Sequence, residues 1–267
     1  MANSFHDQRA RWIGLSKGDF DYSIFFIKCW IPFNAWYCGA YPVHKNVDSK
    51  ILREVKTDNN LFKTRIISLL NNNSVDSQYF KSLIVELQDK LENFNVPNNE
   101  NKISFSSIHF RDNPMTVFNE TKNNIQYQVE LLTITPQNNI RLRAIAVRNG
   151  STIFHYQHTK YDVEHLKNYY DFTQLSNASR NLILKGVEEI NPKKKESLIV
   201  TKKTESLFGT NQILFLNNSD FIAQSLIEIL YKLRCILFHG EITPSANNLS
   251  VYEPAYYIMR ILIQSLQ

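Results

Sequence analysis

The order of apolar and polar residues predicts helices at both ends of the chain. Residues 20–41 are apolar on nearly every side of a helix, which is typical of a buried helix, and Asp19 or Asp21 can cap its start. Pro32 lies inside this stretch and is expected to kink or split the helix. Apolar residues recur at helical spacing in further stretches, where we also expect helices: 48–70, 77–94, 163–190, 221–239 and 254–266.

Between these helices, the pattern changes to short runs rich in β-branched and aromatic residues. The runs that predict strands are 127–135, 140–147 and 152–157. Polar residues at 136–139 and 149–151 separate the runs and are typical of turns. We therefore expect a mainly α fold: a helical bundle formed by 1–94 and 160–267, with a small antiparallel β-sheet of three or four strands inserted at 100–158.

Two polar stretches are predicted to be connections. Residues 95–101 contain a proline and few apolar positions, and residues 191–211 carry lysine pairs and runs. The helical stretch 163–190 is expected to break near Ser176. The chain therefore has clear signals for turns and loops but no internal repeat.

Composition narrows the class of protein. The chain has 267 residues, 43% of them hydrophobic and 12% aromatic, which is enough for a substantial core. The net charge of +5 is compatible with a polyanionic partner but small for a protein that coats nucleic acid. Cys29, Cys38 and Cys235 lack zinc-ligand spacing and indicate a reducing, cytoplasmic environment. The apolar stretch 24–41 is short and interrupted, so we expect no membrane span, and the first residues predict no signal peptide.

The helix predicted over 221–239 carries the most informative residues of the chain. Ser219 or Asp220 can cap it. Its predicted core face is a stripe of aliphatic residues: Ile222, Leu226, Ile229, Leu230, Leu233 and Leu237. At about 100° per residue, Arg234 lies about 80° from the centre of this stripe and His239 about 140° from Arg234. Both side chains are therefore expected to lie outside the core, beside a groove or a partner surface.

The end of this helix combines a permanent cation with a titratable imidazole. Gly240 is predicted to end the helix in the left-handed conformation, which places His239 at the C-terminus, where the helix dipole favours the protonated ring. Arginine is a forked donor for phosphate oxygens and histidine transfers protons near neutral pH, so Arg234 and His239 suit phosphate chemistry. The alternative is structural, because basic residues are common in last helical turns, where they bind free carbonyls.

The segment Arg234–Glu241 resembles the Arg-x4–6-His signature of the HEPN superfamily. The aromatic stretch 25–37 also resembles the first helix of several members, and the order of the helices is similar. The likeness covers roughly 20–94 and 160–267 and leaves out the strand-rich middle. It implies a HEPN-like helical bundle.

For active members of this superfamily, the resemblance implies a homodimer in which two such motifs face each other and cleave RNA without a metal or another cofactor. Carried over to this chain, Arg234 binds the scissile phosphate, and His239 moves protons as the ribose 2′-hydroxyl attacks. The products are a 2′,3′-cyclic phosphate and a 5′-hydroxyl. The resemblance further implies a bacterial toxin or antiviral-defence setting, with an antitoxin or another regulatory protein as a partner.

Cys235 departs from the signature, because active members often have a polar residue directly after the arginine. This departure favours an alternative, a non-catalytic HEPN-like module that binds nucleotide or RNA or serves as a scaffold. A third interpretation is a helical interaction protein with no role in nucleic-acid binding, which the small net charge favours.

Four further residues are candidates for binding the substrate. Arg141 and Arg143 share one face of a predicted strand and can extend a phosphate-binding surface, or they are ordinary solvated side chains. Asn34 lies inside the apolar first helix, where it either lines the cleft or is a hydrogen-bonded polar group of the core. Glu241 either orients the arginine and the histidine or is a surface charge.

Three histidines raise the question of a metal site. If 152–157 is a strand, His155 and His158 point to opposite faces, and His165 lies on a separate helix. We therefore expect surface or turn histidines and no metal site.

Overall fold

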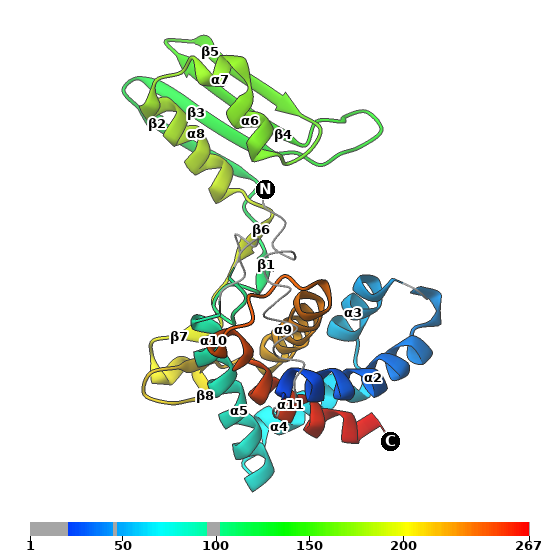
Figure 1. The fold of residues 1–267 in the computed structure, drawn as a ribbon. Helices are drawn as coiled ribbons and strands as arrows, with labels where there is room; N and C mark the ends of the chain where they lie inside the picture. Colours follow the sequence, from blue (N-terminus) through cyan, green and yellow to red (C-terminus); the bar gives the residue numbers. More distant parts are fainter. Residues whose placement is uncertain (1–20, 45–46, 95–101, 267) are drawn as a thin grey trace. The chain divides into compact units, whose positions relative to one another are not determined.

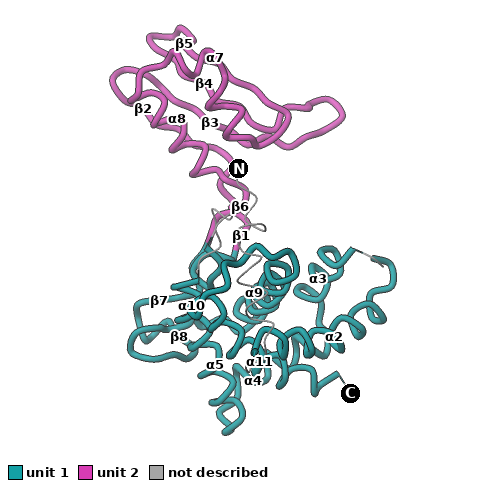
Figure 2. The backbone as a smooth tube through the Cα atoms, viewed as in Figure 1, with its two compact units in different colours: residues 1–109, 196–267 teal, residues 110–195 magenta. Residues whose placement is uncertain are grey.

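The computed structural model describes residues 21–44, 47–94 and 102–266. The chain divides into two compact units (Figure 2). Residues 1–109 and 196–267 form the first, called the helical unit below, and residues 110–195 form the second, called the sheet unit. Each unit has a hydrophobic core of its own. The chain is a mixed α/β protein, mainly helical with small antiparallel sheets.

The helical unit is built from helices at both ends of the chain (Figure 1). They are α2 (Tyr22–Ala40), η1 (Pro42–His44), α3 (Asp48–Thr57), α4 (Leu61–Asn71), α5 (Val75–Glu92), α9 (Ser219–His239), α10 (Ala246–Leu249), α11 (Tyr252–Ile263) and η3 (Gln264–Leu266). A small sheet with the strand order β7–β9–β8 belongs to the same unit. Its elements are β7 (Ile199–Val200), η2 (Lys203–Glu205), β8 (Ser206–Gly209) and β9 (Leu214–Leu216).

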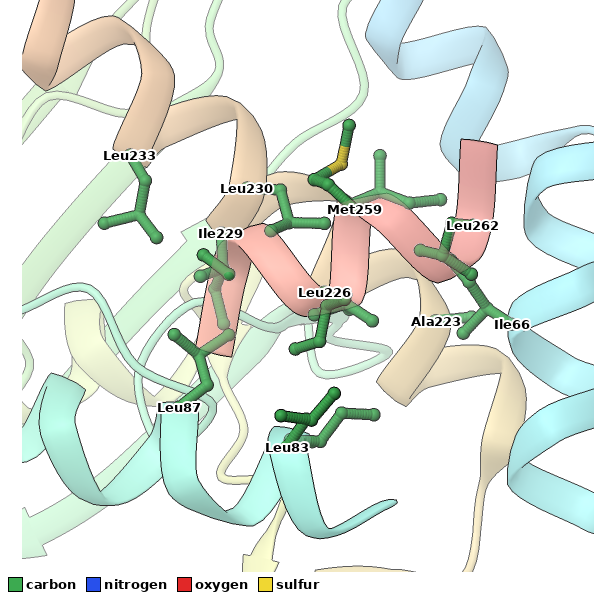
Figure 3. Close-up of a cluster of buried hydrophobic side chains, with 14 of the residues drawn as sticks. Ile66, Leu83, Leu87, Ala223, Leu226, Ile229, Leu230, Leu233, Met259 and Leu262 are labelled. Carbon is green, nitrogen blue, oxygen red and sulfur yellow. The ribbon is translucent and has the colours of Figure 1, made fainter. Parts of the chain in front are cut away.

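Helix α9 runs through the core of the helical unit. Figure 3 shows its aliphatic side chains together with side chains from α4, α5 and α11. The predicted stripe is buried except for Leu237, which is only partly buried, and burial extends to Ile227 and Ile236. Each fully buried aliphatic side chain contributes about 1.5–3 kcal/mol, so this helix is a main source of stability. The catalytic candidates are therefore attached to a helix that is anchored in the core of the unit.

The first predicted helix is present as α2. The Asp21 carboxylate caps it by accepting a hydrogen bond from the backbone N–H of Ser23 at 2.8 Å, as predicted. The helix is continuous through Pro32, so the expected split does not occur. The rings of Phe33 and Tyr37 are buried just beyond the proline, and their packing offsets the missing backbone hydrogen bond.

The single helix predicted over 48–70 is wrong, because the structure has two helices there, α3 and α4. The Asn60 side chain accepts a hydrogen bond from the Lys63 N–H at 3.0 Å and so caps α4. The same amide donates to the Val55 carbonyl at 2.8 Å near the end of α3. One short polar side chain thus replaces helical backbone bonds on both sides of the break.

The remaining helices of this unit lie close to their predicted positions. Helices α5 and α11 each begin two residues earlier than expected. Helix α9 is capped by Asn218, which accepts a hydrogen bond from the Phe221 N–H at 3.0 Å, and not by Ser219 or Asp220. Three consecutive polar residues all have capping ability, so the sequence alone did not select among them. The predicted connection 95–101 lies outside the described residues.

The sheet unit contains a four-stranded antiparallel sheet with the order β2–β3–β4–β5. The elements of the unit are β1 (Phe110–Asp112), β2 (Val117–Lys122), β3 (Ile125–Leu131), β4 (Leu142–Arg148), β5 (Ser151–His158), α6 (Val163–Asn168), α7 (Tyr170–Thr173), α8 (Asn177–Glu189) and β6 (Lys193–Lys195). The predicted strand runs correspond to β3, β4 and β5, and β2 is the additional strand. Strands β1 and β6 pair with each other as a separate two-stranded ribbon.

Helices α6, α7 and α8 pack on the four-stranded sheet, which changes the predicted domain boundaries. They had been assigned with 160–267 to the helical bundle, whereas the structure places them in the sheet unit. The Tyr127 hydroxyl on β3 is 2.9 Å from the Ser179 hydroxyl on α8, and both are buried. The break expected near Ser176 is present, since its hydroxyl accepts a hydrogen bond from the Ser179 N–H at 3.2 Å.

The stretch 191–211 was expected to be an exposed connection, and this is wrong in part because it contains β6, β7 and β8. β6 consists of three lysines and pairs with β1 through backbone groups, so its side chains give no sign of a strand, and β7 and β8 are only two and four residues long. Among the described residues, no helix is both long and apolar enough to cross a lipid bilayer. All three cysteines are free thiols.

Candidate active site around Arg234

Arg234 lies on the side of α9 that faces α3. Its Nη2 atom is 3.4 Å from Oδ2 of Asp48, in the first turn of α3. The guanidinium carbon also lies over the ring of Phe238, 4.6 Å from the ring centroid. About a fifth of the Arg234 side chain, 22%, remains exposed. The guanidinium is thus held by a carboxylate and a ring while part of it stays accessible to a ligand.

Helices α3 and α9 lie side by side (Figure 1), and ion pairs join them at both ends of α3. Asp48 pairs with Arg234 at one end, and Lys56 pairs with Glu228 at the other. Because the earlier residue of α3 contacts the later residue of α9, the two helices run antiparallel. This double attachment fixes the position of Asp48 relative to the arginine.

Only part of the hydrogen-bonding capacity of Arg234 is used. Its Nη1 atom contacts Sγ of Cys235 at 3.9 Å, and sulfur is a weak acceptor. Its Nε atom is buried and has no hydrogen-bond partner among the described residues. A guanidinium carries five N–H donors, so donors remain for the oxygens of a phosphate.

Tyr231 and Cys235 adjoin the arginine on the same helix. Burial raises the pKa of Tyr231, and its hydrogen bond with Cys235 and the charge of Asp48 raise it further. The Tyr231 ring stacks on Trp30 of α2, with the ring centroids 6.3 Å apart. Tyr231 is therefore a neutral phenol at physiological pH and can donate or accept a hydrogen bond beside Arg234.

His239 is the last residue of α9, and its side chain is exposed. Gly240 ends the helix with φ 63° and ψ 27°, as predicted. The Glu241 N–H donates to the Ile236 carbonyl at 3.0 Å, and the Gly240 N–H donates to the Leu237 carbonyl at 3.3 Å, which together form a left-handed cap with two hydrogen bonds. The imidazole forms no hydrogen bond or ion pair within the described part of the chain, so both ring nitrogens are available.

Among the described residues, Asn34 forms no hydrogen bond with Arg234 and instead contacts a tyrosine of its own helix. The half-buried amide donates a hydrogen bond to the Tyr37 hydroxyl on the next turn of α2. Burial raises the pKa of Tyr37 to about 12, with the Asn34 bond lowering it and the charge of Asp48 raising it. Asn34 is therefore a hydrogen-bonded polar group within α2.

The Glu241 carboxylate makes no hydrogen bond or ion pair with Arg234 or His239 among the described residues. The structural contribution of this residue comes from its backbone N–H, which closes the cap of α9. The side chain is half-buried next to the helix end. It is thus near the histidine without fixing it.

Arg141 and Arg143 belong to the sheet unit, whereas Arg234 belongs to the helical unit. Arg141 donates from Nη1 to the Leu132 carbonyl at 2.8 Å. Arg143 forms a hydrogen bond from Nε to Glu130 at 3.0 Å and a second bond from Nη2 to the same oxygen. Both arginines therefore support the structure of the sheet unit with part of their donors.

The histidines of the sheet unit do not form a metal site. The rings of His158 and His165 stack with centroids 4.2 Å apart, and Nδ1 of His165 is 3.0 Å from the Tyr156 hydroxyl. His155 is exposed and follows the buried Phe154 along β5. In the described residues, no group of three His, Cys, Asp or Glu side chains is placed to hold a metal ion.

Sequence reasoning missed Asp48, Tyr231 and Phe238. Tyr231 and Phe238 stand three residues before and four residues after Arg234, so helical spacing was a usable signal for both. No such signal exists for Asp48, because its contact with α9 depends on how two helices distant in the sequence pack.

Comparison of the chain with protein-family models, curated proteins and solved structures gave no match.

Proposed function

We propose that this protein is a metal-independent, cytoplasmic endoribonuclease of the HEPN type, with Arg234 and His239 as its catalytic residues. The observation that carries the proposal is how these two side chains are held and how far they are exposed. Arg234 is held by Asp48 and Phe238 with free donors, and His239 is exposed at a helix C-terminus with both nitrogens unused. This combination provides a fixed cation for a phosphate and a group that can transfer protons.

The chemistry follows from where charge develops. As the ribose 2′-hydroxyl attacks the phosphorus, negative charge increases on the nonbridging oxygens, and the Arg234 guanidinium stabilises it. His239 removes the proton of the 2′-hydroxyl or delivers one to the 5′-oxygen that leaves. The P–O5′ bond breaks as the new P–O2′ bond forms, giving a 2′,3′-cyclic phosphate and a 5′-hydroxyl.

The positions of the two residues favour a site shared by two copies of the chain. Residues five apart on a helix point about 140° away from each other, so one copy directs the two head groups to different sides. Large apolar side chains are exposed on α2, where Ile31 is 64% exposed and Ile24 is 52% exposed. Burial of such side chains against a second copy would stabilise a homodimer.

The sheet unit contributes most of the net positive charge. Residues 110–195 include 12 of the 30 Lys and Arg residues and 8 of the 25 Asp and Glu residues, so they carry +4 of the net +5. A surplus of cations attracts the phosphates of RNA without sequence selection. We propose that the sheet unit holds RNA or a regulatory protein such as an antitoxin, in a toxin or antiviral-defence setting.

The test of this function uses purified protein and total RNA in the presence of EDTA. We expect cleavage that is insensitive to chelation, with products that end in a cyclic phosphate. Arg234→Ala and His239→Ala should each reduce the rate by about 10²–10³-fold. Matched controls are Arg53→Ala and His155→Ala, which remove an exposed arginine and an exposed histidine elsewhere and should leave the rate unchanged. Cleavage by either test variant at the rate of its matched control rejects the assignment.

A second experiment tests the shared site. If the arginine of one copy acts with the histidine of the other, a dimer of Arg234→Ala and His239→Ala chains has one intact site and one inactive site. In an equal mixture about half of the dimers are of this kind, so the mixture should recover about a quarter of the wild-type rate. If both groups act within one copy, the mixture stays inactive.

The alternative is a non-catalytic HEPN-like module that binds nucleotide or RNA, or a scaffold. The contact between Arg234 and the thiol of Cys235 favours it, because the thiol is a poor hydrogen-bonding group where active relatives often have a polar one. RNA binding that depends on Arg234 but is not followed by cleavage would support this alternative.

A further inference from the structure

Phe238 has an unusual position for a large apolar side chain. It lies in the last turn of α9 between Arg234 and His239, and 57% of its surface is exposed. One face of the ring contacts the guanidinium, with 4.6 Å between the ring centroid and the guanidinium carbon. Cation contact uses a single face, so the rest of the exposed ring is free for another flat group.

We propose that Phe238 is a nucleobase-binding residue that makes the enzyme select single-stranded RNA. This inference rests on the proposed nuclease function and identifies the substrate class of the same site. A base can stack on the free face of the ring while a phosphate binds at the edge of the guanidinium. The base and the phosphate can belong to the same nucleotide or to neighbouring nucleotides. Phe238 would thereby place one specific linkage in front of Arg234 and His239.

The chemistry of the surroundings supports a base as the ligand of this ring. Stacking on an aromatic side chain requires an unpaired, exposed base, because the bases of a duplex are already covered on both faces by their neighbours. The guanidinium beneath the ring withdraws electron density from it and adds a favourable contact with an electron-rich base. Stacking of this kind is sequence-tolerant, so it selects strandedness more than base identity.

A structural role for the ring makes a different prediction. If Phe238 only covers the guanidinium, Phe238→Leu removes this cation contact and should slow cleavage by the same factor whether or not the RNA carries a base beside the cut site. If the ring binds a base, only an aromatic replacement should preserve activity. The two roles are therefore separable by changing the residue and the base together.

The experiment first maps the cleavage site in total RNA with wild-type protein. An oligonucleotide of that sequence is then made with one ribonucleotide at the cut site and 2′-O-methyl residues elsewhere, so that only one linkage can react. Versions lacking the base on the 5′ or the 3′ side of this linkage are compared with the full oligonucleotide. The proteins are wild type, Phe238→Leu and Phe238→Trp, with thermal unfolding curves recorded to show that each is folded.

We expect Phe238→Leu to slow cleavage of the full oligonucleotide by about tenfold or more, whereas Phe238→Trp retains most of the activity. Removal of one of the two bases should slow the wild type by a similar factor and have little further effect on Phe238→Leu. Annealing the complementary strand should protect the oligonucleotide from the wild type.

Equal slowing of the full and the base-free oligonucleotides by Phe238→Leu would overturn the inference while leaving the nuclease function intact. Equal cleavage of single-stranded and duplex RNA by the wild type would also overturn it. Failure of the wild type to cleave any RNA would reject the nuclease function and the inference with it.

Discussion

Asp48 and Arg234 form an ion pair, 3.4 Å between Oδ2 and Nη2, that joins the start of α3 to the last turns of α9. Both side chains are partly exposed, 30% and 22% respectively. An ion pair of this exposure contributes at most about 1 kcal/mol to stability. Its main effect is on position, because it restricts where the guanidinium can meet a phosphate.

The first prediction concerns this pair. Asp48→Ala should lower the single-turnover cleavage rate by about tenfold, because the guanidinium is no longer oriented. RNA affinity should stay the same or increase, because a carboxylate that repels phosphate has been removed. The measurement combines cleavage rates with RNA binding by fluorescence anisotropy in a His239→Ala background. A large loss of affinity together with an unchanged rate would contradict the orienting role.

The second prediction concerns the glycine that ends α9. Gly240 has φ 63°, so Gly240→Ala should destabilise the protein by about 1 kcal/mol and disturb the cap that holds His239. Gly39 near the end of α2 is the matched control, because a Cβ there meets no atom within 4 Å. Gly39→Ala should be neutral or slightly stabilising, since alanine favours helix. Urea unfolding measures both, and equal effects of the two substitutions would refute the argument.

The third prediction concerns the alkaline stability of the helical unit. Burial raises the pKa of Tyr37 from its usual value of 10 to about 12, so the folded state holds this proton more tightly than the unfolded state. The corresponding stability is present below pH 10 and is lost as the pH rises from 10 to 12.

Tyr37→Phe should therefore flatten the fall in unfolding free energy between pH 10 and about 12, the window that the raised pKa of Tyr37 defines. Tyr79→Phe is the control, because Tyr79 is 48% exposed. Urea unfolding at several pH values gives the comparison. If both variants lose stability with the same slope as wild type, the raised pKa of Tyr37 does not contribute.

The fourth prediction concerns the contact between α8 and the sheet. A Cβ on Gly186 would lie 2.5 Å from Cδ1 of Phe118 and 2.7 Å from Cγ2 of Val129, both buried. Gly186→Ala should therefore destabilise the sheet unit by about 1–3 kcal/mol through overpacking. Since the two units have separate cores, hydrogen exchange should increase in residues 110–195 and remain unchanged in α9. Uniform destabilisation of both units would show that they unfold as one.

The sequence by itself determined the local structure to a large extent. A long apolar stretch located α2, and apolar residues at helical spacing located α5, α9 and α11, because side-chain periodicity is a property of the element itself. Short runs rich in β-branched and aromatic residues located β3, β4 and β5. Asp21 was one of two residues predicted to cap α2, and Gly240 was predicted to end α9, because capping and left-handed conformation depend on local chemistry. The spacing of Arg234 and His239 on one helix was determined in the same way.

Only the tertiary structure decided which distant residues meet. The pairing of β6 with β1 and the packing of α8 on the sheet depend on partners that no local pattern reveals. The same holds for the site: Asp48 reaches Arg234 because α3 packs antiparallel to α9, whereas Arg141 and Arg143 belong to a separate unit. Contacts of this kind depend on helix packing and strand pairing across the chain, and these are set by burial of whole surfaces, not by residue spacing.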